Sequence, residues 1–382
     1  MTKRMNIIDR RPKAWAKDRR VGAAAKLAVL GVASVLVSTG CAASAPATGT
    51  DSGKPLIGFT SRFISGNTWL ESLSRQVQTH GKELGYDVEA LDARGSAQTQ
   101  IQQMQTFITR GAKAIVLEPI DDRSVAAGVE ATIKAGIPLI VVNDELAPDL
   151  AAKVACNVHS DQFQLGSMVG EKVAEAVAKK FTPADTVKLY IMGILPQEPL
   201  TTNREEGFMK GYNDYFKSNE GPKLERIPNG YGSALPDQTL PIMRDKLSAN
   251  PDVDVIFNMT DTVHGAVAQA LSEAGLVNDK GGASKVIVGS MDGRMSVVKD
   301  MAETPGFPIV ANSLTAPAAS ATLAVNAADR AVKAGSGNGP VCEGKIPTEI
   351  PPVEVVTLET AKQYYDAKFE FAEPSLAKAA AK

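Results

Sequence analysis

Short apolar runs alternate with longer amphipathic segments along residues 55–142. A short apolar run between turn residues predicts a buried strand, and apolar residues three and four positions apart predict a helix. Gly85, Gly111 and Gly136 follow the amphipathic segments, where the left-handed residue that ends many helices is expected. The pattern predicts strands at 55–60, 86–91, 114–117 and 138–142, and helices at 69–84, 97–110 and 123–135.

The same alternation restarts in the second half of the chain. It predicts strands at 187–192, 224–227, 253–258 and 285–288, and helices at 203–216, 235–248, 263–274 and 295–301. Alternation of this kind predicts right-handed βαβ units and parallel sheets that helices cover on both faces. We therefore expect an α/β fold with two doubly wound parallel-sheet lobes. Ligands of such sheets bind beyond the carboxyl ends of the strands, so we expect functional residues in 61–69, 118–122, 143–145, 258–261, 290–293 and 312–313.

The first forty residues have a different character. A basic stretch precedes an apolar run at 27–37, which is too short to span a bilayer as a permanent helix and predicts a cleaved signal peptide over 1–40. Its ending, VSTGC at 37–41, resembles the lipobox of bacterial lipoproteins, which implies that the mature chain begins at a lipid-modified Cys41. Small polar residues at 41–53 predict a flexible tether. Two arginine pairs in the basic stretch leave the twin-arginine and general export routes both open.

Removal of the signal peptide makes the chain acidic. The mature part keeps 32 basic and 41 acidic residues, a net charge of −9. Phosphate contacts need clustered lysine and arginine, so we expect no nucleic-acid partner. The chain has no Gly-x-Ser-x-Gly elbow and no histidine beside a plausible nucleophile, so we expect no catalytic activity and no cofactor.

The sequence offers little for metals or redox chemistry. His80, His159 and His264 lack metal-ligand spacing, so no metal site is expected. Cys156 and Cys342 could form a disulfide in a non-reducing compartment or remain two buried thiols, and the sequence leaves both open.

Several segments resemble a known family when they are taken in order. These segments are ELGY at 83–86, GAKAIVLEP at 111–119, AGIPLIVV at 135–142, SD at 160–161, NREEGF at 203–208 and VGSMDG at 288–293. Their order and spacing over residues 54–357 resemble the periplasmic sugar-binding proteins of ribose-type ABC importers, the type I solute-binding proteins. The resemblance implies two lobes, 54–158 with 314–350 and 159–313 with 351–382, that close over a small polar ligand. It also implies a three-segment hinge near 157–160, 312–315 and 351–355.

The resemblance suggests a role for the loop that contains Asn67 and Trp69. Trp69 aligns with an aromatic residue that packs on the C–H face of a sugar, and large rings suit such apolar faces. Asn67 lies in the same loop and would contact the ligand. The alternative for Trp69 is a core side chain at the start of a helix.

Four positions in the second half align with polar contacts of the family. Asp292 falls where a carboxylate accepts hydrogen bonds from adjacent hydroxyls, although it could instead cap the following helix. Thr260 and Asn312 align with amides that contact sugar. Ligand contact and helix capping are equally plausible for Asp261.

Two arginines of the family's aldose sites are missing. Asn143 and Asp144 stand where aldose binders often carry Asp-Arg, and Thr202 stands where they often carry Arg. Arg62 and Arg204 lie nearby in the alignment and could replace one of the missing groups. Since arginine in these sites contacts a ring oxygen or an anomeric hydroxyl, the loss disfavours ribose and favours an acyclic polyol such as xylitol.

The expected function is therefore a solute-binding lipoprotein of an ABC importer for a pentitol or pentose. We expect it to be a monomer, anchored by lipid on the extracytoplasmic face of the cell membrane, that delivers ligand to permease and ATPase subunits. A sensory protein that presents a sugar or autoinducer to a chemoreceptor or histidine kinase is the alternative, because it would share the fold.

Overall fold

The computed structural model describes residues 53–277, 284–335 and 337–372. The predicted signal peptide, Cys41 and residues 41–52 of the predicted tether lie outside this part. Within it, every helix is too short or too polar to serve as a membrane span.

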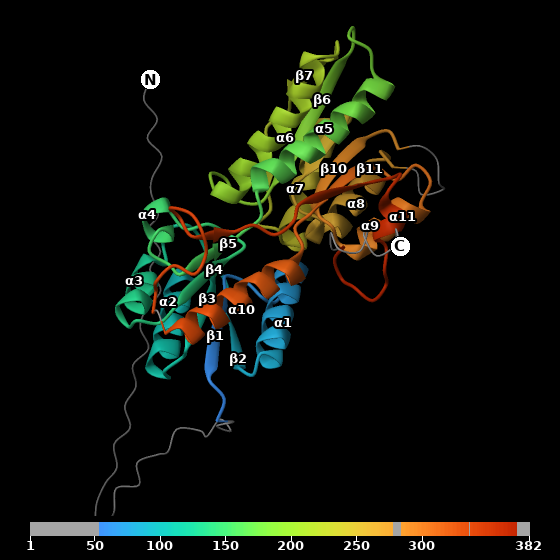
Figure 1. The fold of residues 1–382 in the computed structure, drawn as a ribbon. Helices are drawn as coiled ribbons and strands as arrows, with labels where there is room; N and C mark the ends of the chain where they lie inside the picture. The colour runs from blue at the N-terminus through green and yellow to red at the C-terminus, as the bar shows by residue number, and fades with distance from the viewer. Residues whose placement is uncertain (1–52, 278–283, 336, 373–382) are drawn as a thin grey trace, which may run out of the picture. The chain divides into compact units, whose positions relative to one another are not determined.

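The first lobe is built on a parallel sheet with the strand order β12-β5-β4-β3-β1-β2 (Figure 1). Helices α1 and α10 pack together over one face, and α2 and α3 pack together over the other. The strands are β1 (Leu56–Ser61), β2 (Asp87–Asp92), β3 (Ala114–Glu118), β4 (Leu139–Val142), β5 (Cys156–Val158) and β12 (Thr348–Glu349). The helices are α1 (Thr68–Glu83), α2 (Ala97–Thr109), α3 (Ala126–Lys134), α4 (Pro148–Ala151) and α10 (Pro317–Ala334).

The second lobe is built on a sheet with the order β13-β11-β10-β9-β6-β7, in which β13 alone of the described strands runs antiparallel. The strands are β6 (Thr186–Gly193), β7 (Lys223–Arg226), β8 (Gly230–Tyr231), β9 (Val255–Asn258), β10 (Ile287–Asp292), β11 (Ile309–Leu314) and β13 (Glu354–Thr357). The helices are α5 (Gln162–Lys180), α6 (Pro199–Lys217), α7 (Pro236–Ala249), α8 (His264–Glu273), α9 (Met295–Glu303) and α11 (Ala361–Tyr364).

Helices α5 and α6 lie unusually close together. Gly170 of α5 and Gly207 of α6 sit at the crossing, where an added Cβ would collide with the backbone carbonyls of Phe208 and Phe163. The missing side chains let the two backbones meet, which fixes the position of α6 and of the residues near its start.

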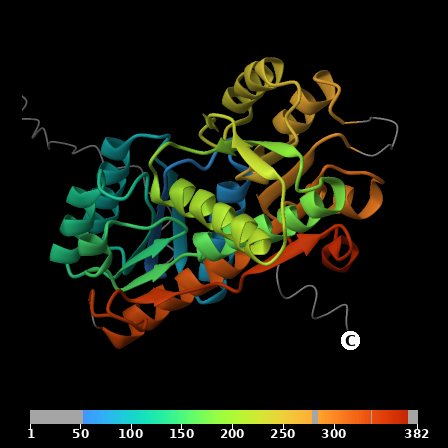
Figure 2. The same cartoon turned by 90° about the horizontal axis from the view of Figure 1, so that it is seen from above.

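The chain passes between the two sheets three times, after β5, after β11 and after β12. These passages lie in or next to the predicted hinge segments at 157–160, 312–315 and 351–355. As a result, α10 and β12 join the first sheet although they follow most of the second sheet in sequence. Figure 2 shows the last passage, where the red C-terminal segment runs on from the orange helix α10 toward the second sheet.

The predicted fold class is confirmed, and the predicted strands and helices lie within a few residues of the observed ones, with some exceptions. Helix α3 begins at Ala126 rather than residue 123, because the Asp121 carboxylate accepts hydrogen bonds from the backbone of Arg123 and Ser124 and holds a turn there. Strand β10 continues past residue 288 to Asp292 because its polar side chains find buried partners. The long helices α5 and α10 were not among the predicted elements.

Cys156 and Cys342 form a disulfide, which answers the question that the sequence left open. Their Cα atoms are 5.4 Å apart, and the bond joins β5 to the segment between α10 and β12. It therefore fastens a late part of the chain to the first sheet, close to two of the three passages between the lobes.

Candidate ligand-binding cavity

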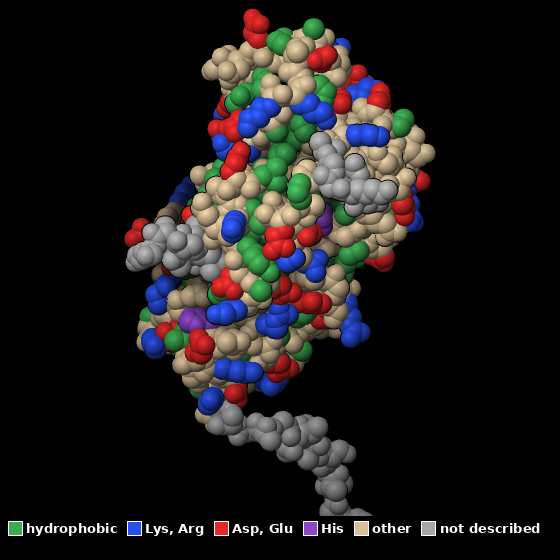
Figure 3. All heavy atoms as spheres, turned by 90° about the vertical axis from the view of Figure 1, so that its right-hand side faces the viewer, with side chains coloured by type: hydrophobic (Ala, Val, Ile, Leu, Met, Phe, Trp, Pro, Cys, Tyr) green, Lys and Arg blue, Asp and Glu red, His purple; other side chains and the backbone are tan. Residues whose placement is uncertain are grey.

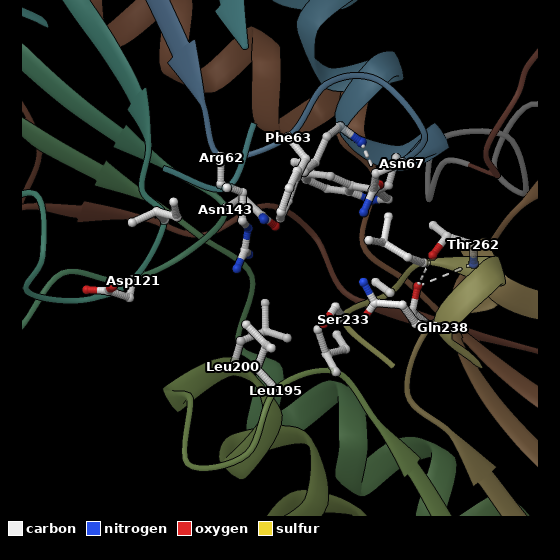
Figure 4. A pocket seen from close by; sticks show the side chains of 18 of the residues that line it. Arg62, Phe63, Asn67, Asp121, Asn143, Leu195, Leu200, Ser233, Gln238 and Thr262 are labelled. Carbon is white, nitrogen blue, oxygen red and sulfur yellow. Dashed lines mark hydrogen bonds between the residues drawn. The ribbon is translucent and has the colours of Figure 1, made fainter. Parts of the chain in front are cut away.

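A cavity of about 400 Å³ lies between the carboxyl ends of the strands in the two lobes. Figure 4 shows side chains from both lobes facing one another across it. Its size lies within the range of small-molecule sites. The predicted site residues that line it are Arg62, Asn67, Trp69, Asn143, Arg204, Thr260 and Asp292.

Arg62, which follows β1, is almost fully buried and engages three carboxylates. Its Nε lies 2.9 Å from Oε1 of Glu118, its Nη1 lies 2.6 Å from Oε1 of Glu198, and a third ion pair joins it to Asp144. Burial disfavours the charged form, but Glu118 and Glu198 outweigh burial and raise the pKa of Arg62. The guanidinium group is therefore charged and committed to the protein.

Glu118, at the end of β3, organises this side of the cavity. It is fully buried and accepts hydrogen bonds from the Ser61 hydroxyl at 2.8 Å, the Arg62 backbone N–H at 3.0 Å and Nδ2 of Asn143 at 3.2 Å. Asn143 has a φ of 70°, a left-handed conformation that asparagine tolerates better than most residues. The signal for Glu118 was its position at the end of an apolar run, although its individual role was not predicted.

Trp69 reaches the cavity from the start of α1. Its indole Nε1–H donates to Oγ1 of Thr315 at 2.7 Å, and that hydroxyl in turn donates to Oδ1 of Asp292 at 3.2 Å. Trp69 also packs in the apolar core between α1, α10 and the first sheet, so it lines the cavity and belongs to the core as well. Asn67 caps α1, since its Oδ1 accepts from the Leu70 N–H at 3.1 Å.

Arg204 and Asp292 form the polar side of the second lobe. Arg204 donates from Nη2 to Oδ1 of Asp292 at 3.1 Å and from Nε to Oε1 of Gln162 at 2.8 Å, and it also contacts the Met259 carbonyl. Oδ2 of Asp292 accepts from the Thr260 hydroxyl at 2.5 Å. Asp292 has a φ of 97°, a strained conformation for a residue with a side chain, and its buried contacts hold it there.

Asp261 and Asn312 lie behind this group rather than in the cavity lining. Oδ2 of Asp261 accepts from the Arg294 N–H at 2.6 Å and from Nδ2 of Asn312 at 2.9 Å, while Oδ1 of Asn312 accepts from the Gly293 N–H at 3.2 Å. Burial raises the pKa of Asp261, and the nearby Asp292 carboxylate raises it further. The pair holds the turn that follows Asp292. Neither residue lines the cavity, which corrects the expectation of ligand contact for Asn312 and favours a structural role over ligand contact for Asp261.

Thr202 and Asp144 also lie outside the lining. Thr202 is exposed on α6, where its hydroxyl donates to the Glu198 carbonyl at 2.9 Å. Asp144 is buried beside Arg62 and faces its guanidinium group. Any effect of Asp144 on a ligand therefore passes through Arg62, and Thr202 is placed away from the cavity.

Part of the lining was not predicted residue by residue. Phe63 and Asp121 lie within the expected segments 61–69 and 118–122, although neither was singled out. The remaining lining residues of this group, Leu195, Leu200, Ser233, Leu235 and Gln238, lie outside every expected segment. Figure 4 shows Leu195 and Leu200 across the cavity from Arg62 and Asn143. Residues 194–195 follow β6, so the rule of strand ends would have found them.

The described residues hold one group that could in principle ligate a metal ion, namely Cys156, Cys342 and Glu349. Its two sulfur atoms are bonded to each other, so this group is a disulfide with a neighbouring carboxylate and not a pair of thiolate ligands. On the face shown in Figure 3, acidic and basic side chains are interspersed, without a broad basic patch.

Comparison with known proteins identifies the family. The family model described as periplasmic binding protein domain matches residues 57–336, so the chain belongs to that family. It is 24% identical over 209 residues to the ribose import binding protein of Escherichia coli, covering 55% of this chain and 65% of that protein. It is also 24% identical over 261 residues to the D-xylose-binding periplasmic protein of E. coli, covering 68% of this chain and 72% of that protein.

Solved structures share the fold. An ABC transporter solute binding protein of Mycobacterium smegmatis with bound glycerol superposes with a TM-score of 0.70 at 22% identity, covering 84% of this chain and 99% of that one. One of Bacillus halodurans with bound myo-inositol gives 0.66 at 21% identity, covering 84% and 100%. The two E. coli relatives are named as binding proteins, in line with the expectation that the chain is not an enzyme, while the solved structures, at under 25% identity, show the fold alone.

Proposed function

We propose that this chain is the solute-binding subunit of an ABC importer that captures a small sugar or sugar alcohol between its lobes and delivers it to a permease. The observation that carries the proposal is the cavity, which sets the Trp69 ring against the hydrogen-bonding groups of Asp292, Arg204 and Asn143. A carbohydrate has apolar C–H faces and a rim of hydroxyls, so it needs both kinds of surface. Relatives named for ribose and xylose support the same ligand class.

Within that class, we favour a polyol such as xylitol over ribose. Arg62 is held by Glu118, Asp144 and Glu198, and Arg204 by Gln162, Met259 and Asp292. Both guanidinium groups are thus occupied by protein acceptors. This leaves less capacity to recognise the ring oxygen or anomeric hydroxyl that distinguishes an aldose.

The test is a thermal-shift screen of the chain without residues 1–41 against polyols and aldoses. A ligand at 100 times its dissociation constant adds about 2.7 kcal/mol of stability. A larger shift with xylitol than with ribose supports the polyol. A shift with aldopentoses alone overturns the polyol and leaves the sugar class, and no shift with any carbohydrate overturns the proposed function.

The membrane anchor is a separate part of the proposal and rests on the sequence at 37–41. Lipidation of Cys41 would hold the protein, as a monomer, on the extracytoplasmic face of the cell membrane. Cys41→Ala in the full chain is expected to release the protein from the membrane fraction. Retention of the variant at the wild-type level in that fraction would contradict the anchor without bearing on the ligand.

A further inference from the structure

The groups around the cavity carry more negative than positive charge. Two carboxylates among the described residues line the cavity, those of Asp121 and Asp292. Three more form ion pairs with Arg62 at the edge of the cavity, those of Glu118, Asp144 and Glu198. Two guanidinium groups, those of Arg62 and Arg204, face these five carboxylates. The set therefore has an excess of three negative charges before any ligand enters.

The excess is concentrated on the Arg62 side. Arg204 and Asp292 balance each other in the second lobe, at 3.1 Å. Arg62 has three carboxylate partners of its own, and Asp121 adds a fourth carboxylate that forms no ion pair among the described residues. Oδ1 of Asp144 is buried and accepts no hydrogen bond from a described residue.

Burial strengthens the effect of this imbalance. Glu118, Asp144 and Arg62 are each at most 8% exposed, so water screens their charges poorly. No lysine or histidine is among the described residues that line the cavity. An added cation would gain electrostatic energy there, and an added anion would lose it.

We propose that the preferred ligand is a polyhydroxylated amine, an amino sugar or amino polyol whose ammonium group lies on the Arg62 side of the cavity near Asp121. The inference rests on the proposed function and narrows its ligand class. Hydroxyls of the same ligand would face Asn143, Gln238 and Asn67, whose amides line the cavity. Gln238 lines the cavity and is exposed, so its side-chain amide can reach a ligand hydroxyl. The same excess of negative charge around the cavity disfavours the binding of sugar acids and sugar phosphates.

The test compares matched ligands that differ in one group. Titration calorimetry of the mature chain uses sorbitol, glucamine and gluconate as an acyclic set, and galactose, galactosamine and galacturonate as a cyclic set. We expect the amine to bind about tenfold tighter than its neutral parent, or about 1.4 kcal/mol, in at least one set, and the acid to bind weakest.

Two variants localise the charge. Asp121→Asn removes the carboxylate but keeps an oxygen that can accept from the Arg123 and Ser124 backbone, so the turn should persist. It should reduce the ratio of amine to neutral affinity several-fold. The control is Asp149→Asn, which removes the same charge from an exposed residue that pairs with Arg123 and lies outside the lining.

Each outcome decides the proposal. Amine preference that Asp121→Asn reduces and Asp149→Asn preserves supports it. Neutral sugars that bind as tightly as the amines in both sets overturn the inference and leave the proposed function standing. Failure of every carbohydrate to bind overturns both.

Discussion

Nη1 of Arg62 lies 2.6 Å from Oε1 of Glu198, and the two residues belong to different lobes. Arg62 follows β1 of the first sheet, whereas Glu198 immediately precedes α6 of the second lobe. Both side chains are at least nine-tenths buried. The ion pair therefore joins the lobes at the edge of the cavity and favours the arrangement in which they are close together.

Glu198→Gln tests this connection. The variant loses the charge but can still accept a hydrogen bond, and Arg62 keeps Glu118 and Asp144 as partners, so no buried cation is stranded. We expect the ligand-free chain to populate the open arrangement more, which small-angle scattering would detect as a larger radius of gyration. Ligand affinity should fall several-fold because part of the binding energy must then close the lobes.

The matched control is Glu205→Gln, which removes a carboxylate that pairs with Arg226 inside the second lobe. Its radius of gyration should equal that of the wild type. Identical radii and affinities for Glu198→Gln and the wild type would show that the Arg62 contact does not govern closure.

The hydrogen bond between Trp69 and Thr315 should contribute measurably to stability. Trp69→Phe removes the indole donor and is expected to lower the free energy of unfolding by about 1 kcal/mol, whereas Trp69→Ala should cost about 3–5 kcal/mol through lost packing. Urea unfolding followed by circular dichroism measures both. A double-mutant cycle with Thr315→Val isolates the pair, and strictly additive effects would contradict the 2.7 Å bond.

The buried Asp261 carboxyl should make stability depend on pH. Burial and Asp292 raise its pKa in the folded chain above the ordinary aspartate value of 3.8, so the unfolded chain loses this proton at lower pH than the folded chain does. The stabilisation that Asp261 adds to the folded chain is therefore complete below pH 3.8 and is lost as the pH rises through the raised pKa. Asp261→Asn keeps the acceptor for Arg294 and Asn312 without the charge.

The free energy of unfolding of Asp261→Asn, relative to the wild type, should increase from pH 4 to pH 9 in urea titrations. His264 affects stability in the opposite direction, because burial lowers its pKa to about 4 and its contribution to the free energy of unfolding is lost as the pH falls below 6.5. His264 is present in both proteins, so its effect cancels in the difference between them. Asp185→Asn is a control that should show no such increase, because hydrogen bonds from Thr182 lower the pKa of Asp185 and its contribution therefore changes only below this pH range. A constant difference between Asp261→Asn and wild type would refute the raised pKa.

Loss of the disulfide should destabilise the first lobe. Cys156 and Cys342 are 186 residues apart in sequence, so their bond restricts the unfolded chain strongly. The double variant Cys156→Ser/Cys342→Ser is expected to lose about 2–4 kcal/mol of unfolding free energy. Reductant should lower the stability of the wild type to that of the double variant and leave the variant unchanged. A wild type that keeps its stability once thiol titration shows full reduction would disprove the expectation.

The sequence predicted the fold because the two periodicities, of strand and helix, follow directly from side-chain burial. The rule of strand ends also placed Asn143 and Asp292 at the cavity, since a parallel sheet brings those ends to one edge. The resemblance to aldose binders misplaced Thr202 because helix geometry sets Thr202 and Arg204 about 200° apart around α6, so only one of them can face inward.

The ion pair between Arg62 and Glu198 could not be predicted from the sequence for a different reason. Glu198 is 136 positions away and belongs to the other lobe, so no local pattern connects the two residues. Asp261 and Asn312 look like ligand contacts in the sequence because both are polar and follow or end apolar runs. Their actual use, as supports for the turn after Asp292, depends on hydrogen bonds across three segments of the chain.

The left-handed backbone at Asp292 has an evolutionary consequence. Glycine would relax a φ of 97°, but it would also delete the carboxylate that Arg204, Thr260 and Thr315 contact. Most other side chains would keep the strain and lose the contacts. A lineage could therefore alter Leu195 or Leu200 one substitution at a time to accept new ligands, whereas change at Asp292 would require its neighbours to change with it.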